Sequence, residues 1–212
     1  MLSYVSLTSD TQNDPYRQRE QLFTSGVFKG GFIMLKSDSA ILLVVDVQEK
    51  LLPVIYREEN LTANIIRLIQ GMQVLEIPII VTEQYPQGLG KTVPEIAQLL
   101  TNIEPLSKTS FSCYGDETFR KTLEASGRKQ VLICGIEAHV CVYQTAMDLK
   151  AAGYEVQVIA NAVSSRTPGN KEIGLNLMRQ MGIIITGTET VLFEMLKIAE
   201  GDKFKAISHI VK

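Results

Sequence analysis

Cysteine and histidine are scarce in this sequence, which contains three cysteines and two histidines. An odd and sparse set of cysteines, in a chain without a recognisable secretory segment, argues against a disulfide framework and predicts a reducing, cytoplasmic location. No histidine or cysteine has a partner at a metal-ligand spacing such as H-x-x-x-H or C-x-x-C. We therefore expect no structural zinc site and, more generally, no metal and no cofactor.

Long apolar runs and an excess of charge are also lacking. The longest apolar runs, residues 40–45 and 77–81, fall far short of the roughly 18 residues that a membrane span requires. The 21 basic and 23 acidic residues leave a formal charge of -2, without the basic stripe by which nucleic-acid binders release counterions. Neither a membrane nor a nucleic acid is therefore an expected partner, and nuclease activity has no support from charge or motif.

What is present is the composition of one folded domain with an appendage. The chain has 212 residues, of which 45% are hydrophobic and 21% charged, as is usual for a folded protein with a sizeable core. Residues 1–33 show neither a sustained helical nor a strand period, and their acidic residues argue against a transit peptide. We expect residues 1–35 to form a flexible N-terminal extension and residues 36–212 to form a single domain, with Met34 as a candidate start of the folded core.

From residue 39 onward, short β-branched runs alternate with amphipathic helical patterns. This alternation is typical of successive βαβ units and a parallel sheet. It predicts an α/β fold with three αβα layers and a six-stranded parallel sheet. The expected strands span residues 40–45, 79–82, 103–106, 130–134, 155–159 and 183–186.

Helix boundaries are marked by residues with capping chemistry. An apolar stripe predicts a helix over residues 61–75, Pro94 suits a first helical turn, and Asp116 and Thr167 are expected N-caps. Glycines at positions 127, 153 and 182 follow helical patterns, where a left-handed residue ends a helix.

Three chemically useful residues follow predicted strands. Ligands of open parallel sheets bind beyond the carboxyl ends of the strands, and Asp46, Lys108 and Cys141 are expected to meet at this edge. Each also has a structural interpretation: a carboxylate that caps a loop, a solvated surface lysine and a small buried apolar residue. A catalytic interpretation of these residues therefore depends on whether their side chains lie together in the fold.

Together, the three side chains would form a nucleophilic site. A thiol at a helix N-terminus beside an ammonium is expected to have a lowered pKa, which favours the thiolate. A carboxylate within hydrogen-bond reach would accept the thiol proton and return it to a leaving amine. Backbone N–H groups of the turn G-I-E-A-H-V-C would stabilise an oxyanion. For His139, at the start of the same helix, a capping or packing role is favoured over a place in the pocket.

The segment Q-G-L-G-K-T at residues 87–92 partly matches a phosphate-binding P-loop. The P-loop pattern requires glycine at the position that Tyr85 occupies, so the match fails. No G-x-G-x-x-G follows any predicted strand, and no nucleotide-binding fingerprint is present.

Four ordered motifs resemble the isochorismatase-like cysteine hydrolases, and within that superfamily the isochorismatase domain-containing proteins. The motifs are D-V-Q at 46–48, T-E-Q-Y-P-Q-G-L-G at 82–90, S-K-T-S-F-S at 107–112 and C-G-I-E-A-H-V-C-V at 134–142. The resemblance extends from about residue 39 to near the C-terminus.

The resemblance implies a catalytic triad of Asp46 as general base, Lys108 as the cation and Cys141 as nucleophile. It also implies a cis peptide bond between Ile136 and Glu137 that aims the amides of Glu137 and Cys141 into an oxyanion hole. The implied reaction is hydrolysis of a small amide or related C–N bond, that is, an amidase activity without a cofactor. The substrate is expected to be a small molecule, and the implied assembly is a homo-oligomer.

Two departures from relatives argue against nicotinamide and against isochorismate as the substrate. Metal-dependent nicotinamidases of this superfamily carry an Asp and His cluster between the first two motifs, whereas this chain has no histidine before His139. Members that cleave isochorismate often lack the cysteine that this chain keeps as Cys141.

The residues expected to shape the pocket are Gln48, Tyr85, Phe111, Tyr114, Glu137 and His139. The alternative is a catalytically silent binding or regulatory oligomer of the same fold.

Overall fold

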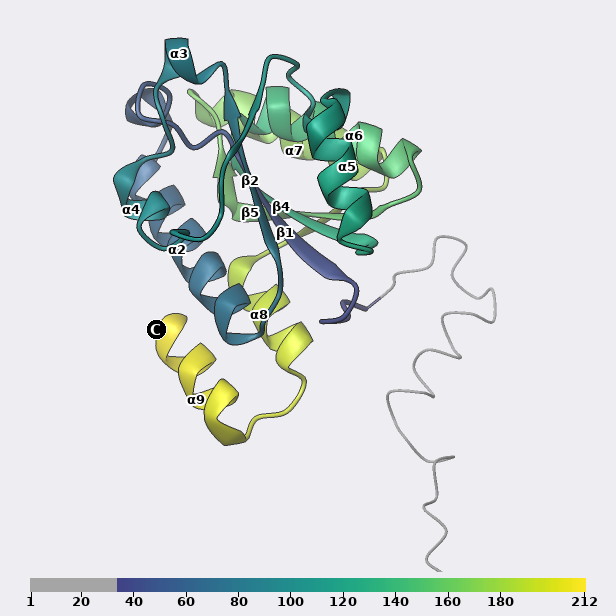
Figure 1. Ribbon diagram of the computed structural model, residues 1–212. Helices are drawn as coiled ribbons and strands as arrows, with labels where there is room; N and C mark the ends of the chain where they lie inside the picture. Colours follow the sequence, from purple (N-terminus) through teal and green to yellow (C-terminus); the bar gives the residue numbers. More distant parts are fainter. Residues whose placement is uncertain (1–33) are drawn as a thin grey trace, which may run out of the picture. The chain divides into compact units, whose positions relative to one another are not determined.

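The computed structural model describes residues 34–212 (Figure 1). The predicted N-terminal extension, residues 1–35, lies almost wholly outside the described residues. Leu35 is buried in the core, and its backbone N–H donates to Glu194 Oε1 at 2.8 Å.

A six-stranded parallel sheet forms the centre of the fold, as predicted. The strand order is β3-β2-β1-β4-β5-β6, and every neighbouring pair is parallel. The strands are β1 (Ala40–Val45), β2 (Ile79–Gln84), β3 (Leu106–Lys108), β4 (Gln130–Ile136), β5 (Glu155–Ser164) and β6 (Ile184–Thr186). The third strand begins where the prediction of residues 103–106 ended, so Lys108 is its last residue and does not follow it. The fifth strand runs five residues past its predicted end, because its pairing with β4 resumes at Val163 after an irregularity.

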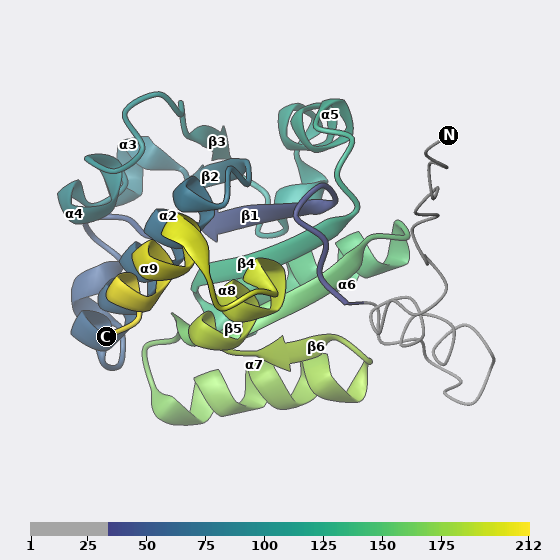
Figure 2. The same cartoon turned by 90° about the horizontal axis from the view of Figure 1, so that it is seen from below.

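Helices cover both faces of this sheet (Figures 1 and 2). One face carries α2 (Glu58–Val74), α4 (Pro94–Ala97), α8 (Thr188–Leu196) and α9 (Gly201–Ile210). The other carries α5 (Glu117–Ala125), α6 (Tyr143–Ala151) and α7 (Pro168–Gln180). Shorter helices in the connections are η1 (Leu52–Val54), α3 (Pro86–Leu89), η2 (Cys113–Gly115) and the π-helix η3 (Ala138–Val142). The result is the predicted three-layer αβα architecture. None of the helices described here is long and apolar enough to cross a membrane.

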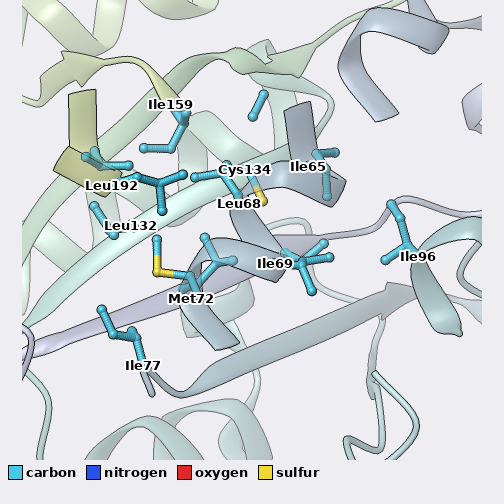
Figure 3. Packing of buried hydrophobic residues seen from close by; sticks show 14 of the residues in the cluster. Ile65, Leu68, Ile69, Met72, Ile77, Ile96, Leu132, Cys134, Ile159 and Leu192 are labelled. Carbon is cyan, nitrogen blue, oxygen red and sulfur yellow. The ribbon is translucent and has the colours of Figure 1, made fainter. Parts of the chain in front are cut away.

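Successive apolar side chains along the buried strands point to opposite faces of the sheet and so contribute to two hydrophobic cores. Leu42 and Val44 of β1 face the α2 layer, whereas Leu43 and Val45 face the opposite layer. Figure 3 shows the first core, in which the apolar stripe of α2 packs on the sheet. Its labelled residues are Ile65, Leu68, Ile69 and Met72 of α2 with Leu132, Cys134, Ile159, Leu192, Ile77 and Ile96. Because β1 is buried on both faces, its sequence is a continuous apolar run.

The predicted N-caps and helix-ending glycines are confirmed by hydrogen bonds and dihedral angles, whereas the helix predicted over residues 61–75 begins three residues earlier, at Glu58. Asp116 accepts from the N–H of Phe119 at 3.0 Å, and Thr167 Oγ1 accepts from the N–H of Asn170 at 3.1 Å. The three glycines at positions 127, 153 and 182 have φ of +67°, +85° and +73°, which is the left-handed conformation that ends a helix.

Gly135 allows β4 to approach β1 closely. Its φ is +113°, and a Cβ atom there would lie 2.1 Å from the carbonyl oxygen of Val45. Only glycine fits this position. Its side-chain-free backbone brings the end of β4 against the residue that directly precedes Asp46.

Candidate active site

The three predicted catalytic residues follow or end strands at the same edge of the sheet. Asp46 comes directly after β1, Lys108 is the last residue of β3, and Cys141 lies in η3 after β4. Strands β3, β2, β1 and β4 are consecutive neighbours. The side chains therefore converge at the carboxyl ends of four adjacent strands, where parallel sheets bind ligands.

Lys108 and Asp46 form a buried ion pair. Lys108 Nζ lies 2.7 Å from Asp46 Oδ2, and the two side chains are 1% and 0% exposed. The ammonium also donates to Gln84 Oε1 at 2.6 Å and to the carbonyl oxygens of Ser110 and Phe111, each at 3.2 Å. Burial alone would lower the pKa of Lys108, but the Asp46 charge and the nearby thiols outweigh it and raise the pKa. Lys108 is thus a fixed cation, not a solvated surface lysine.

Asp46 is held through both carboxylate oxygens. Oδ2 accepts from Lys108, and Oδ1 accepts from the hydroxyl of Thr82 at 2.7 Å. The backbone of Asp46 has a φ of +51° and donates its N–H to the Thr82 carbonyl at 3.1 Å. A left-handed conformation at a residue other than glycine is uncommon, and here it turns the carboxylate inward at the end of β1.

Cys141 hydrogen bonds to the same carboxylate, but its acidity differs from the prediction. Its thiol is 7% exposed. Burial raises the pKa of Cys141, the charge of Asp46 and a hydrogen bond to Asp46 raise it further, and Lys108 opposes them. The expectation of a lowered pKa is therefore wrong, because helix-terminus reasoning omitted the desolvation of the thiol and the neighbouring carboxylate. At neutral pH Cys141 is a thiol with its proton acceptor already in place.

Sequence reasoning missed the residues that hold this arrangement. Thr82 and Gln84, two residues apart on β2, bind Asp46 and Lys108 respectively. Cys113 lies below them, fully buried, with its sulfur 3.7 Å from Thr82 Oγ1. Burial, with the charge of Asp46, raises the pKa of Cys113 to about 11. The spacing of two residues between Thr82 and Gln84 places both side chains on the same face of β2. This signal could be used only with the strand order, which places β2 between β1 and β3.

The turn that carries Cys141 contains the cis peptide bond that the resemblance implied. The peptide bond between Ile136 and Glu137 is cis. The carbonyl of Glu137 accepts from the N–H groups of Val140 and Val142, at 3.0 and 3.2 Å. The carboxylate of Glu137 accepts from the backbone N–H and Nε of Arg166, at 2.9 and 3.1 Å. Glu137 therefore anchors the turn to the segment after β5.

Two of the predicted pocket residues, Gln48 and Tyr114, make structural contacts. Gln48 is buried, and its amide binds only backbone groups of Gln84 and Gly90, at 2.7 to 3.0 Å. Tyr114 packs edge-on against Tyr154, with ring centroids 6.2 Å apart. Tyr154 directly precedes β5, at the amino ends of the strands and opposite the catalytic edge. These contacts give Gln48 and Tyr114 structural roles, and their place in a substrate pocket stays a prediction.

The other pocket candidates remain near the catalytic edge. Tyr85 and Phe111 are each 55% exposed, and the carbonyl of Phe111 binds Lys108. A cavity of about 270 Å³ lies beside Lys108, with Tyr85 in its wall. His139 Nδ1 lies 3.0 Å from Ser165 Oγ, so its contact is with the segment after β5.

Within residues 34–212, no three His, Cys, Asp or Glu side chains are arranged to hold a metal ion.

Comparison with known proteins agrees with this fold. Residues 40–190 match the family described as the Isochorismatase domain. Isochorismatase domain-containing protein 2 of Danio rerio is 40% identical over 182 residues, which cover 85% of this chain and 91% of the relative. The structure of MAR1 ribonuclease from Caenorhabditis elegans is 36% identical, with a TM-score of 0.79 over 84% of this chain and 92% of the other.

A more distant structure shows the same fold. The YcaC gene product of Escherichia coli, described as an octameric hydrolase of unknown specificity, is 22% identical, with a TM-score of 0.80 over 84% of this chain and 89% of that chain. With the family match across most of residues 34–212 and a 40% identical relative, the chain belongs to the isochorismatase family and has its hydrolase-type fold.

Proposed function

We propose that this protein is a cysteine hydrolase that cleaves a small amide or related C–N bond. The observation that carries the proposal is the carboxylate of Asp46, which binds the ammonium of Lys108 at 2.7 Å and lies close enough to Cys141 to raise the pKa of its thiol. The buried carboxylate of Asp46, as the base, thus lies beside both a fixed cation, Lys108, and a nucleophile, Cys141. This is the arrangement that nucleophilic catalysis requires.

In the first half-reaction, Asp46 takes the proton of Cys141 as the sulfur attacks the substrate carbonyl carbon. The developing oxyanion is received by the backbone N–H groups of Glu137 and Cys141. The C–N bond then breaks, and Asp46 returns the proton to the leaving nitrogen, which departs as ammonia or an amine. The acyl group remains on Cys141 as a thioester.

In the second half-reaction, Asp46 takes a proton from water as the water oxygen attacks the thioester carbon. The carbon–sulfur bond breaks, the acid product leaves, and the proton restores the thiol of Cys141. Lys108 remains an ammonium throughout, consistent with its raised pKa. Its charge offsets the negative charge that moves between sulfur and carboxylate.

The test is a panel of small primary and secondary amides, with ammonia or amine release as the readout. The wild-type chain is compared with Cys141→Ala, and an RNA substrate is included because the C. elegans relative is described as a ribonuclease. Amide turnover that Cys141→Ala abolishes supports the proposal. If no amide turns over, the silent binding or regulatory oligomer replaces it. RNA cleavage that survives in Cys141→Ala would instead indicate a nuclease that does not use the thiol.

We also propose that the protein is a homo-oligomer. The E. coli protein is described as octameric, and α7 with its C-cap Met181 presents an exposed apolar stripe at every fourth residue. Its members, Ile173, Leu177 and Met181, are 55%, 40% and 52% exposed. Light scattering coupled to size exclusion should show a multimer that Leu177→Glu makes smaller. A wild-type monomer would refute the proposal.

The compartment is a separate proposal. Cys113, Cys134 and Cys141 are all free thiols, and the proposed mechanism requires Cys141 to stay reduced. We therefore propose a reducing, cytoplasmic setting. Fractionation of cells that express the native chain tests it, and recovery in the secreted fraction would contradict it.

A further inference from the structure

A second hollow lies at the carboxyl edge of the sheet, between the start of α2 and the start of α7. Its volume is about 230 Å³, below the roughly 300–1,000 Å³ of pockets that hold drug-sized ligands. Asp46, Lys108 and Cys141 do not contribute to its wall. The wall includes Tyr56, Arg57, Asn60, Ser164 and Lys171.

Two cations from different elements line this hollow, and neither is neutralised. Arg57 precedes α2, and Lys171 lies in the first turn of α7. Among the residues described by the structure, no carboxylate lies within ion-pair distance of either cation. The Arg57 guanidinium lies over the ring of Tyr56, 5.3 Å from its centroid. The wall of the hollow itself contains no aspartate or glutamate.

Holding the two cations there has an energetic cost. Burial lowers the pKa of Lys171, and repulsion from Arg57 lowers it further. Since the charged form of Lys171 is disfavoured in the folded protein, an anion in the hollow would relieve both the lost hydration and the repulsion. A pair of like charges around a cavity is thus better explained by a bound anion than by a contribution to stability.

The wall is also fixed in place and carries neutral donors. The N–H of Tyr56 donates to the Ser165 carbonyl at 2.9 Å, and Ser164 Oγ donates to the Tyr56 carbonyl at 2.7 Å. These bonds tie the Arg57 loop to the end of β5. Asn60, whose side-chain amide is able to donate a hydrogen bond, is also part of the wall. Glu58 and Glu59 line an adjacent hollow, whose wall also includes Arg57 and Asn60, but neither glutamate lies in the wall of this one.

We propose that this hollow is a binding site for a small oxyanion, such as phosphate or a short carboxylate, held between Arg57 and Lys171. The site is separate from the catalytic carboxylate and thiol. Its ligand is small because the volume is small, and it is anionic because two unpaired cations and amide donors face it.

The test titrates inorganic phosphate, and separately acetate, into the full-length protein at constant ionic strength and follows binding by calorimetry. The wild type should bind with a saturable isotherm, and Lys171→Gln and Arg57→Gln should each weaken binding at least tenfold. Lys121→Gln is the matched control, because it removes the same charge from an exposed lysine on α5 and should bind as the wild type does. The ratio of phosphate to acetate affinity distinguishes the two classes of oxyanion.

A thermal measurement separates binding from folding. In buffer without phosphate, Lys171→Gln should unfold at the same temperature as the wild type or higher, since it removes a disfavoured charge. Phosphate also stabilises proteins in general by exclusion from their surface, so the proposal requires a larger upward shift for the wild type than for Lys171→Gln. No saturable binding by the wild type, or equal binding by Lys171→Gln and Arg57→Gln, would overturn it.

Discussion

Asp46 is the residue on which the contacts of the candidate site converge. Its two carboxylate oxygens accept hydrogen bonds from Thr82 and Lys108, and the same carboxylate raises the pKa of the nearby Cys141 thiol. A buried carboxylate without such donors would be strongly disfavoured. The same contacts that make its burial tolerable also orient it toward the sulfur, so stability and chemistry depend on the same hydrogen bonds.

Asp46→Asn should separate the reactivity of the thiol from turnover. The charge of Asp46 raises the pKa of Cys141, whereas Lys108 lowers it. Removal of the negative charge should therefore lower the pKa of Cys141 and speed its alkylation by iodoacetamide at pH 7 to 8. Amide hydrolysis should instead fall by roughly 10²–10⁴-fold, the usual contribution of a general acid–base, because no group returns the proton to the leaving nitrogen. Unchanged hydrolysis in this variant would exclude Asp46 as the proton carrier.

Thr82→Val should show that Thr82 positions Asp46. The change keeps the side-chain shape and removes one hydrogen bond to a charged group, which is worth about 1.5–3 kcal/mol. Hydrolysis is expected to fall about tenfold or more, with an altered pH profile. Thr188→Val is the control, because Thr188 is equally buried and its hydroxyl donates to Asn161 at 3.0 Å, away from the catalytic residues. Equal losses of activity in the two variants would leave Thr82 with a purely structural role.

At this scale the sequence predicted the reacting groups but not their surroundings. Asp46, Lys108 and Cys141 were identifiable because each follows or ends a strand with little intervening chain. Thr82 and Gln84 were not, because their contacts depend on β2 lying between β1 and β3. The sign of the Cys141 pKa shift was wrong because burial is a property of the packed molecule.

At the scale of elements, the π-helix η3 and helix α7 together position the nucleophile. A Cβ atom on Gly174 of α7 would lie 2.7 Å from the Ala138 carbonyl oxygen and 2.9 Å from the Cα of His139. The two helices thus touch backbone to backbone. π-helical turns are rare and concentrate at functional sites, and this one places Cys141 two residues ahead of α6.

Gly174→Ala should disturb this contact and with it the nucleophile. Because the neighbouring atoms are backbone, they cannot rotate away, and overpacking of this kind costs about 1–3 kcal/mol. We expect a lower free energy of unfolding in urea and slower hydrolysis. Gly169→Ala, on the same helix with no atom within 4 Å of its added Cβ, should be neutral or stabilising by up to about 1 kcal/mol. A Gly174→Ala variant as active and stable as Gly169→Ala would refute the packing argument.

The strands were largely predictable, with errors at their ends, whereas α2 begins three residues before its predicted start and α8 and α9 were not predicted. β1 was predicted with its observed bounds because apolar residues fill both of its faces. The end of β5 was missed because Asn161 and its neighbours interrupt the apolar pattern where pairing with β4 is irregular. The π-helix has no periodic signature over five residues, so sequence patterns indicated only a helix start.

At the scale of the whole molecule, burial of the thiols couples folding to pH. Cys134 lies inside β4, and burial raises its pKa above its ordinary value of 9.0. Above pH 9 the unfolded chain ionises this thiol and the folded chain does not, so stability falls as pH rises. Urea unfolding under reducing conditions should therefore show a smaller loss between pH 8 and 10.5 for Cys134→Ala than for wild type. Equal losses would mean that Cys134 ionises in the folded protein.

The overall architecture followed from the sequence because alternation of strands and helices leaves few parallel topologies. The two cores, the six parallel strands and the layer order all result from that alternation. What the alternation does not specify is which loops meet at the carboxyl edge. The cation-lined hollow between α2 and α7 was invisible for this reason, since Arg57 and Lys171 are 114 residues apart in the chain.

The most direct test of the account asks which atom forms the covalent bond. The full-length protein is mixed with p-nitrophenyl acetate, quenched in acid within the first turnover and digested, and the acetyl group is located by mass spectrometry. The account predicts acetylation of Cys141, none of Cys113 or Cys134, and loss of the burst in Cys141→Ala. A burst that survives in Cys141→Ala, or an acetyl group located on another residue while Cys141 stays unmodified, would contradict it.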